Sequence, residues 1–420
     1  MKKIFLFALT AVCAIALVVV ITKKIKKMNE YKEVHLKVFG VTIMADGIGR
    51  QSVELIKALK DEMSVAYFPV RETNPKDVPE DILAILNGGK KNKSKVAILE
   101  DVFQQPGDRA WYKMVKRTSH EQIRIAYSLV ESTKIPPEWV SGMNCYFDAI
   151  VVPDRFLVDV YKNSGVEIPI FELPLGLYLD RFFEEPLRSS SKKPMVFGYL
   201  GSCIGRKNHL RIIQGFAKAF GNRDDVILRM NYRYGQEDVI QKIREEIDAL
   251  GLENIQFTNI PLDSVAYLNY FKTLDCYVSA SKGEGFSIQP REAMALGIPV
   301  IATNNTAQET ICNSGYVRSI PSKIEEPALY WWGKVYGKQF DCEINDIAKA
   351  FLDMFENYDY YLKQTADARE WVHSYEFKNL KNRYINLVKP KKVILGEKDE
   401  ITDEYLMTTS KTLYNKYKNL

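Results

Sequence analysis

The sequence predicts an α/β protein with two doubly wound, parallel-sheet domains that face each other across a cleft, and with a transmembrane helix at the N-terminus. Short apolar runs alternate with helical stretches in both halves of the chain, and a polar segment divides the halves. The length agrees, because 420 residues with 46% hydrophobic and 26% charged side chains exceed what one ordinary core holds. An uncharged run near the start predicts the membrane helix.

Charge and cysteine content exclude two other classes of protein. The 58 basic and 53 acidic residues leave a formal net charge of only +5, which is too small for a nucleic-acid-binding field. The six cysteines show no Cys-x-x-Cys pair and no metal-ligand spacing. We therefore expect reduced thiols rather than a zinc site.

Residues 4–22 form an uncharged run of 19 residues near the N-terminus. As a helix, such a run crosses a hydrocarbon core of ~30 Å. A cleavable signal peptide, the alternative, usually has a shorter apolar region and a small-residue cleavage site, whereas lysines follow this run. Those lysines outnumber the two that precede it, so the positive-inside rule predicts a single-pass membrane anchor with the rest of the chain in the cytosol.

The first domain is expected over residues 35–187. Its strands are predicted at 35–42, 65–70, 95–99 and 149–152, with a helix at 51–60 after the first strand. This alternation predicts a parallel sheet whose ligand crevice lies at the carboxyl ends of the strands.

The second domain is expected over residues 194–365, after a linker rich in polar and small residues that ends at Pro194. Glycines follow three of its helices, where left-handed caps are expected. Its strands are predicted at 195–200, 226–230, 255–257, 276–280 and 300–303, and its helices at 209–220, 238–250, 264–273 and 290–296.

The strongest chemical signal lies in residues 281–303, which predict a strand end, a glycine-containing loop, a short helix and another strand. Glu284 falls on the loop and Glu292 in the first helical turn, so both carboxylates are expected at the ligand-binding edge of the sheet. Gly285 lets the backbone approach a ligand closely, and the helix N-terminus favours an anion. The alternative is a solvated Glu284 and a Glu292 that only stabilises the helix N-terminus.

A second strand-to-helix turn carries Arg206 and Lys207 before Asn208, which we expect to cap the next helix. Two cations at a helix N-terminus suit a diphosphate, although such a pair can also be a solvated surface feature. His209, in the first turn of that helix, is expected to be exposed. A weaker signal is the turn with Gly47 and Gly49 after the first strand, which alone indicates either a dinucleotide loop or a simple turn.

The run from Glu284-Gly285-Phe286 through Glu292-Ala293-Met294-Ala295 to Gly297-Ile298-Pro299-Val300 resembles the retaining glycosyltransferases of the GT-B fold, family four. Their mark is two glutamates separated by seven residues in this context. The resemblance implies that Glu292 binds the ribose hydroxyls of a nucleotide-sugar donor and that Glu284 lies near the donor sugar. It also implies backbone N–H groups from Phe286 and Ser287 at the sugar or phosphates. Lys207 would hold the phosphates with Arg206, and Gly47 and Gly49 would face them from the first domain.

The resemblance covers roughly residues 37–381 and implies two Rossmann-like domains, with helices at 366–388 that cross back to the first domain. No role is predicted for the tail, 389–420. Glu131 is expected either on the acceptor side of the cleft or as a buried structural carboxylate. His120, with no matching motif around it, is expected on a helix surface.

The function so predicted is transfer of a sugar from a UDP- or GDP-sugar to a hydroxyl of a glycan or lipid-linked acceptor, with retention of configuration and no cofactor. No Asp-x-Asp pair follows a strand. Metal independence is predicted, since lysine, arginine and a helix dipole can stabilise the leaving phosphate. Two alternatives stay open: a sugar-nucleotide epimerase of the same architecture and a catalytically inactive membrane scaffold.

Overall fold

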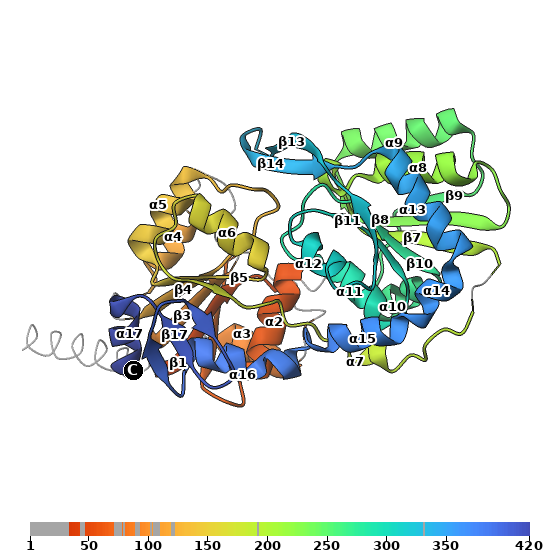
Figure 1. Cartoon of the computed structure of the whole chain (residues 1–420). Helices are drawn as coiled ribbons and strands as arrows, with labels where there is room; N and C mark the ends of the chain where they lie inside the picture. The colour runs from red at the N-terminus through yellow and green to blue at the C-terminus, as the bar shows by residue number, and fades with distance from the viewer. Residues whose placement is uncertain are drawn as a thin grey trace, which may run out of the picture.

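The computed structural model describes residues 33–42, 47–70, 78, 80–88, 93–100, 103, 110–118, 122–190, 193–330 and 332–420. Two α/β bodies stand side by side, each built around its own six-stranded parallel sheet (Figure 1). The predicted transmembrane span, 4–22, lies outside these residues. Within the described ranges, no helix is long and apolar enough to cross a membrane.

The N-terminal sheet has the order β2-β1-β3-β4-β5-β6, and every pairing is parallel. Strand β4 was not predicted because Arg124 interrupts its apolar run; in the fold this guanidinium donates to Thr118 Oγ1 at 2.7 Å and to the Tyr146 carbonyl at 3.3 Å. The strands are β1 (Glu33–Gly40), β2 (Val65–Pro69), β3 (Lys93–Glu100), β4 (Ile123–Tyr127), β5 (Ala149–Val152) and β6 (Ile170–Glu172). The helices are α2 (Gly47–Leu59), α3 (Glu80–Gly88), α4 (Ala110–Val115), α5 (Pro137–Tyr146) and α6 (Arg155–Asn163).

The C-terminal sheet has the order β12-β11-β10-β7-β8-β9, again all parallel. The order of strand addition reverses between β7 and β10, because β8 and β9 are added on one side of β7 and β10 to β12 on the other. In such sheets ligands bind at the carboxyl ends of the strands at this point. The strands are β7 (Met195–Cys203), β8 (Val226–Gly235), β9 (Ile255–Thr258), β10 (Cys276–Ser279), β11 (Val300–Asn304) and β12 (Arg318–Pro321). The helices are α8 (His209–Phe220), α9 (Glu237–Leu250), α10 (Ser264–Lys272), α11 (Ile288–Ala295), α12 (Gln308–Cys312), α13 (Ile344–Glu356) and α14 (Tyr358–Lys363).

An antiparallel hairpin, β13 (Ile324–Leu329) and β14 (Val335–Asp341), was not predicted from the sequence. It leaves the C-terminal sheet after β12 and reaches over toward the N-terminal body (Figure 1). The backbone N–H of Thr133 donates to the Lys338 carbonyl at 3.2 Å, and the N–H of Lys338 donates to Thr133 Oγ1 at 2.9 Å. The hairpin is therefore hydrogen-bonded to the opposite domain.

Helices α7 (Asp180–Phe183) and α15 (Thr365–His373) lie where the chain passes between the two bodies (Figure 1). After α15, the end of the chain returns to the N-terminal body (Figure 1). Helix α16 (Phe377–Val388) packs on α2, where Gln51 Nε2 donates to the Tyr384 hydroxyl at 2.8 Å. The tail, for which the sequence indicated no role, forms β15 (Val393–Leu395), β16 (Glu400–Ile401), β17 (Leu406–Thr408) and α17 (Lys411–Lys418). Lys416 of α17 pairs with Asp148 at 2.7 Å, so the tail is part of the first body.

Candidate functional site

Two charged loops meet at the switch point of the C-terminal sheet. One follows β7 and carries Arg206 and Lys207 in a short 3-10 helix, Gly205–Lys207, before α8 begins. The other follows β10 and carries Glu284 before α11 begins. The N–H of Lys282 donates to the Arg206 carbonyl at 2.9 Å, so the two loops are joined by their backbones.

Glu284 is the centre of this cluster and is only 6% exposed. Its Oε1 accepts from Lys207 Nζ at 2.5 Å and lies 3.0 Å from Arg206 Nη1. The predicted alternative of a solvated loop charge is therefore wrong for Glu284, because the carboxylate is buried and paired with two cations. Removing one member would leave a buried charge without its partner, which usually costs ~3–5 kcal/mol.

The pKa values in this cluster follow from burial and from the pairing. Burial alone would raise the pKa of Glu284, but the charges of Lys207 and Arg206 outweigh it and hold this pKa at about 2. Burial lowers the pKa of Lys207 below its ordinary value, against the opposing effect of Glu284. Glu284 is thus ionised at physiological pH, and its charge is fixed in place.

A third charge, Glu131, comes from the N-terminal domain on the segment after β4. Its Oε1 lies 3.1 Å from Arg206 Nη2, so Arg206 joins carboxylates of both domains. The side chain of Glu131 remains 34% exposed, unlike that of Glu284. Glu131 is therefore not a buried carboxylate but a partly exposed one at the contact between the domains, and its place on the acceptor side stays a prediction.

Glu292 lies in α11 and is 2% exposed. Its Oε1 accepts from Arg50 Nη2 at 2.9 Å, and its Oε2 accepts from the Tyr267 hydroxyl at 2.5 Å. Arg50 belongs to α2 of the N-terminal domain and Tyr267 to α10. The expected position in the first helical turn is wrong, because α11 begins at Ile288 and Glu292 is its fifth residue. The carboxylate forms an ion pair between the domains instead.

Glycines mark the places where the two domains touch. A Cβ atom at Gly283 would overlap with the Glu131 carbonyl oxygen, and one at Gly285 would lie 2.8 Å from Leu129 Cδ1. A Cβ at Gly47, the first residue of α2, would lie 2.9 Å from Ile288 Cδ1. In this structure these glycines permit the N-terminal domain to close directly onto the loop around Glu284. Gly49 is buried in the first turn of α2.

Phe286 and Ser287 connect Glu284 to α11, and Ser287 has a left-handed backbone with φ 70°. The sequence did not single out their support, Arg291, which is fully buried. Its guanidinium donates to the carbonyls of Phe286 and Ser287 and lies against the rings of Phe286 and Tyr375. Arg291 thereby fixes the shape of the loop. In the sequence, this role was indicated only by the position of Arg291 between Glu284 and Glu292.

Asn208 departs from its predicted role as a helix cap. It precedes α8 with φ 61°, but its side chain makes no capping hydrogen bond. Instead Asn208 Nδ2 donates to Asp341 Oδ1 at 2.7 Å, and Asp341 Oδ2 lies 3.0 Å from Lys282 Nζ. Asp341 ends the hairpin, so this carboxylate ties the hairpin to both charged loops, a link between residues too far apart in sequence to predict.

His209 was expected to be exposed, and this expectation is wrong. The ring is 2% exposed, lies edge-on to Tyr199 at 4.6 Å, and neither of its nitrogens has a hydrogen-bond partner among the described residues. Burial, with a further contribution from Lys207, lowers the pKa of His209 to about 3. The imidazole of His209 is therefore neutral at physiological pH. His120 lies outside the described residues.

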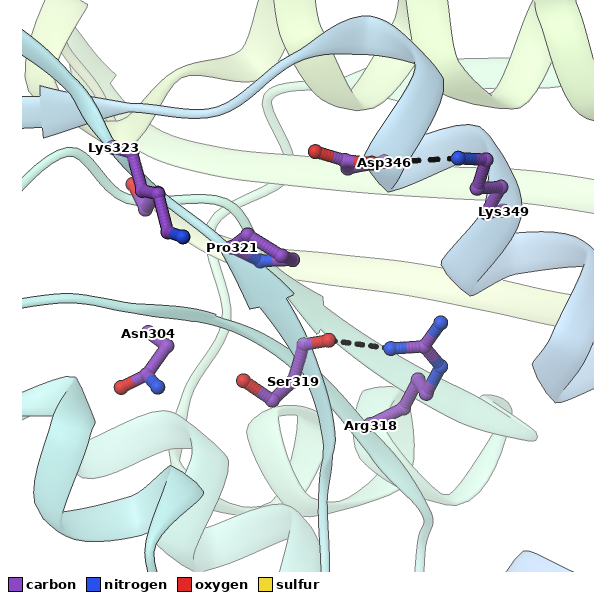
Figure 2. A pocket seen from close by; sticks show the side chains of 8 residues that line it. Asn304, Arg318, Ser319, Pro321, Lys323, Asp346 and Lys349 are labelled. Carbon is purple, nitrogen blue, oxygen red and sulfur yellow. Dashed lines mark hydrogen bonds and ion pairs between the residues drawn. The ribbon is translucent and has the colours of Figure 1, made fainter.

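Two hollows lie away from the charged cluster. One, of about 350 Å³, is at the outer end of the C-terminal sheet, where Arg318 donates to the Ser319 carbonyl and Lys349 pairs with Asp346 at 3.8 Å (Figure 2). The other, of about 480 Å³, lies between α6 and α12 beside Trp371 and Tyr375. Among the described residues, no group of three or more His, Cys, Asp or Glu side chains could hold a metal ion.

The architecture and the charged cluster agree with comparisons to known proteins. Residues 181–321, which include Arg206, Lys207, Glu284 and Glu292, match the family model for glycosyl transferases group 1. The crystal structure of a glycosyltransferase from Rickettsia africae ESF-5 is similar, with a TM-score of 0.61 and 17% identity over 86% of this chain and 98% of that one. Anabaena HepE in complex with UDP gives a TM-score of 0.61 with 11% identity over 85% of this chain and 99% of that one.

A shorter stretch is more similar in sequence. The lipopolysaccharide core biosynthesis mannosyltransferase LpsB of Rhizobium meliloti (strain 1021) is 34% identical over 79 residues, which are 18% of this chain and 20% of that protein. Taken with the matching family model and the shared fold, this similarity shows that the chain is a glycosyltransferase with a GT-B architecture.

Proposed function

We propose that the chain transfers a sugar from a UDP- or GDP-sugar to a hydroxyl of a glycan or lipid-linked acceptor, with retention of configuration and without a metal ion. The observation that carries the proposal is the cluster of Arg206, Lys207 and Glu284 at the switch point of the C-terminal sheet. Cations at the start of a helix suit a diphosphate. Structures of Anabaena HepE with UDP and with UDP-glucose support this donor class.

The donor would lie against the C-terminal domain. Its diphosphate would meet Arg206 and Lys207, its ribose would meet Glu292, and its sugar would lie near Glu284. Breaking the bond between the sugar carbon and the phosphate oxygen leaves an oxocarbenium-like centre and a negative leaving group. Because Arg206 and Lys207 are held by buried contacts, their positive charge is already in place when that negative charge develops.

The acceptor would enter from the N-terminal domain, past Gly49 and Glu131. Its hydroxyl oxygen forms the new bond to the sugar carbon on the face that the phosphate leaves, and its proton passes to a phosphate oxygen. The same two cations supply the electrostatic stabilisation that a metal ion gives in other transferases, so activity should persist in EDTA. In this proposal residues 4–22 hold the enzyme at a membrane, with the catalytic domains in the cytosol.

A donor screen tests the proposal. The full chain in mild detergent is incubated with UDP- and GDP-sugars, and release of nucleoside diphosphate is measured beside the variants Lys207→Ala and Glu292→Ala. A matched control is Lys218→Ala, an exposed cation at the other end of α8. Release from one donor that is lost in the first two variants and kept in the control supports the proposal.

Other outcomes point to the alternatives. A donor sugar that changes configuration without acceptor or nucleotide release would indicate an epimerase. No turnover of any donor, with the protein folded, would indicate a scaffold. Proton NMR of the first-formed product reports whether configuration is retained, and membrane fractionation with and without residues 1–28 reports the anchor.

A further inference from the structure

The carboxylate of Glu292, which we assign to the donor ribose, already accepts hydrogen bonds from two side chains of the protein. Glu292 uses Oε1 for Arg50 at 2.9 Å and Oε2 for Tyr267 at 2.5 Å, so each of its oxygens has a partner. Tyr267 lies on the same domain as Glu292, but Arg50 comes from the opposite domain. The contact with Arg50 is therefore the one that can change when the domains move.

The surroundings of this pair leave little room. Glu292 is 2% exposed, the side chain of Arg50 is 26% exposed, and Gly47 is packed against Ile288 one turn from Arg50. Contacts of Gly283 and Gly285 with residues 129–131 close the same interface at the next loop. A ribose hydroxyl that bonds to Oε1 of Glu292 would compete with Arg50 for this oxygen, because a carboxylate that is 2% exposed leaves little room for a further donor.

We propose that Arg50 is a gate on donor binding, which holds Glu292 in the closed form and must be displaced by the ribose of the nucleotide. The inference rests on the proposed function, because it takes Glu292 as the ribose ligand. Donor binding then requires the open form, and the apparent dissociation constant is the intrinsic one divided by the fraction of molecules that are open.

Binding of UDP and of GDP to the full chain, measured by isothermal titration calorimetry, tests the gate. Arg50→Ala removes the competitor and leaves Glu292 and Tyr267 in place, so the nucleotide should bind about three- to tenfold more tightly, which corresponds to an open fraction of about a third to a tenth. Arg50→Lys keeps the charge and should fall between the two. Lys57→Ala is the matched control, because Lys57 lies two turns further along α2 and contacts Tyr178 instead.

Small-angle scattering of the same proteins provides a second measurement. Arg50→Ala should increase the radius of gyration without nucleotide, and wild type should approach this value when nucleotide is added. Equal or weaker nucleotide binding by Arg50→Ala, with binding still lost in Glu292→Gln, overturns the gate and leaves the proposed function standing. No nucleotide binding by wild type, or binding that Glu292→Gln leaves intact, overturns the proposed function and the gate with it.

Discussion

Arg206 of the C-terminal domain joins Glu131 of the N-terminal domain, with its Nη2 3.1 Å from Glu131 Oε1 and its Nη1 3.0 Å from Glu284 Oε1. One planar guanidinium can do this because its two arms point in fixed and different directions, which a lysine could not reproduce. Closure of the domains and placement of the Glu284 loop are thereby linked through a single side chain.

Glu131→Gln tests this link. The substitution keeps the shape of the side chain but removes one charge-assisted contact across the cleft, worth about 1.4 kcal/mol, so kcat should fall about tenfold. KM for the donor should rise as well, since Glu131 contacts Arg206, which is assigned to the donor diphosphate. Steady-state kinetics separate the two constants. Glu138→Gln, an exposed carboxylate on α5, is the control, and an unchanged kcat in Glu131→Gln would show that the contact has no role in turnover.

Gly283→Ala should hold the domains apart. The new methyl group would overlap with the Glu131 carbonyl, and the substitution adds no backbone strain because Gly283 is outside the left-handed region. Misplaced catalytic groups can cost about a hundredfold in rate, and we expect a loss of that order with an unchanged melting temperature. Gly205→Ala, with nothing within 4 Å of its Cβ, is the matched control. Equal activity in the two variants would contradict closure as a requirement.

Gly337→Ala should detach the hairpin from the opposite domain. Its Cβ would lie 2.6 Å from the Lys134 backbone nitrogen, and Gly337 has φ 71°. Gly315→Ala carries the same backbone strain, with φ 81°, but meets no atom within 4 Å. A comparison of the two variants therefore separates the effect of backbone strain from the effect of the lost contact with residues 133–134. Limited proteolysis should cut the hairpin faster only in Gly337→Ala, and similar rates in both variants would mean that the contact with residues 133–134 does not hold it.

His209 should make the protein sensitive to mild acid. Folding lowers the pKa of His209 from its ordinary value of 6.5 to about 3. Between these two pH values, the unfolded chain binds a proton at His209 and the folded chain does not. The free energy of unfolding is therefore unaffected above pH 6.5 and decreases as the pH falls below it, by about 2 kcal/mol at pH 5.

His209→Phe removes this proton and keeps an aromatic ring against Tyr199. Urea unfolding at pH 7 and pH 5 should show that most of the loss seen in wild type is absent in the variant. A loss of the same size in both proteins would mean that another group causes the acid sensitivity.

Several features of the site could be predicted from local sequence. Glu284 was placed correctly on a loop, because strand and glycine patterns fix local geometry. Glu292 was expected in a first helical turn but lies in the second, because α11 begins at Ile288 rather than at Pro290. Arg206 and Lys207 were placed before α8 for the same reason. By contrast, Arg50 pairs with Glu292 across 242 positions of sequence, and Tyr267 across 25. No periodicity reports such contacts, since they depend on how the two sheets face each other.

The errors have similar causes. Asn208 is a residue type that favours helix caps, but its side chain is oriented so that Nδ2 donates to the buried carboxylate of Asp341, and its oxygen makes no capping hydrogen bond. His209 lies in a first turn, where histidine is usually exposed, but its ring is buried against Tyr199 of β7. The first error arose because the hairpin at 324–341 was not recognised, and the second because contacts between a helix and its neighbouring strand are not visible in local sequence.

The alternation of strands and helices, the two-sheet architecture and the positions of four charged residues at one sheet edge were predictable from local sequence. These follow from hydrophobic periodicity and turn chemistry, which act over a few residues. Only the tertiary structure decided that Glu131 reaches Arg206, that Arg50 occupies Glu292 and that the tail belongs to the first body. Such contacts are set by the packing of whole domains, and their energies depend on burial that no single segment of the chain specifies.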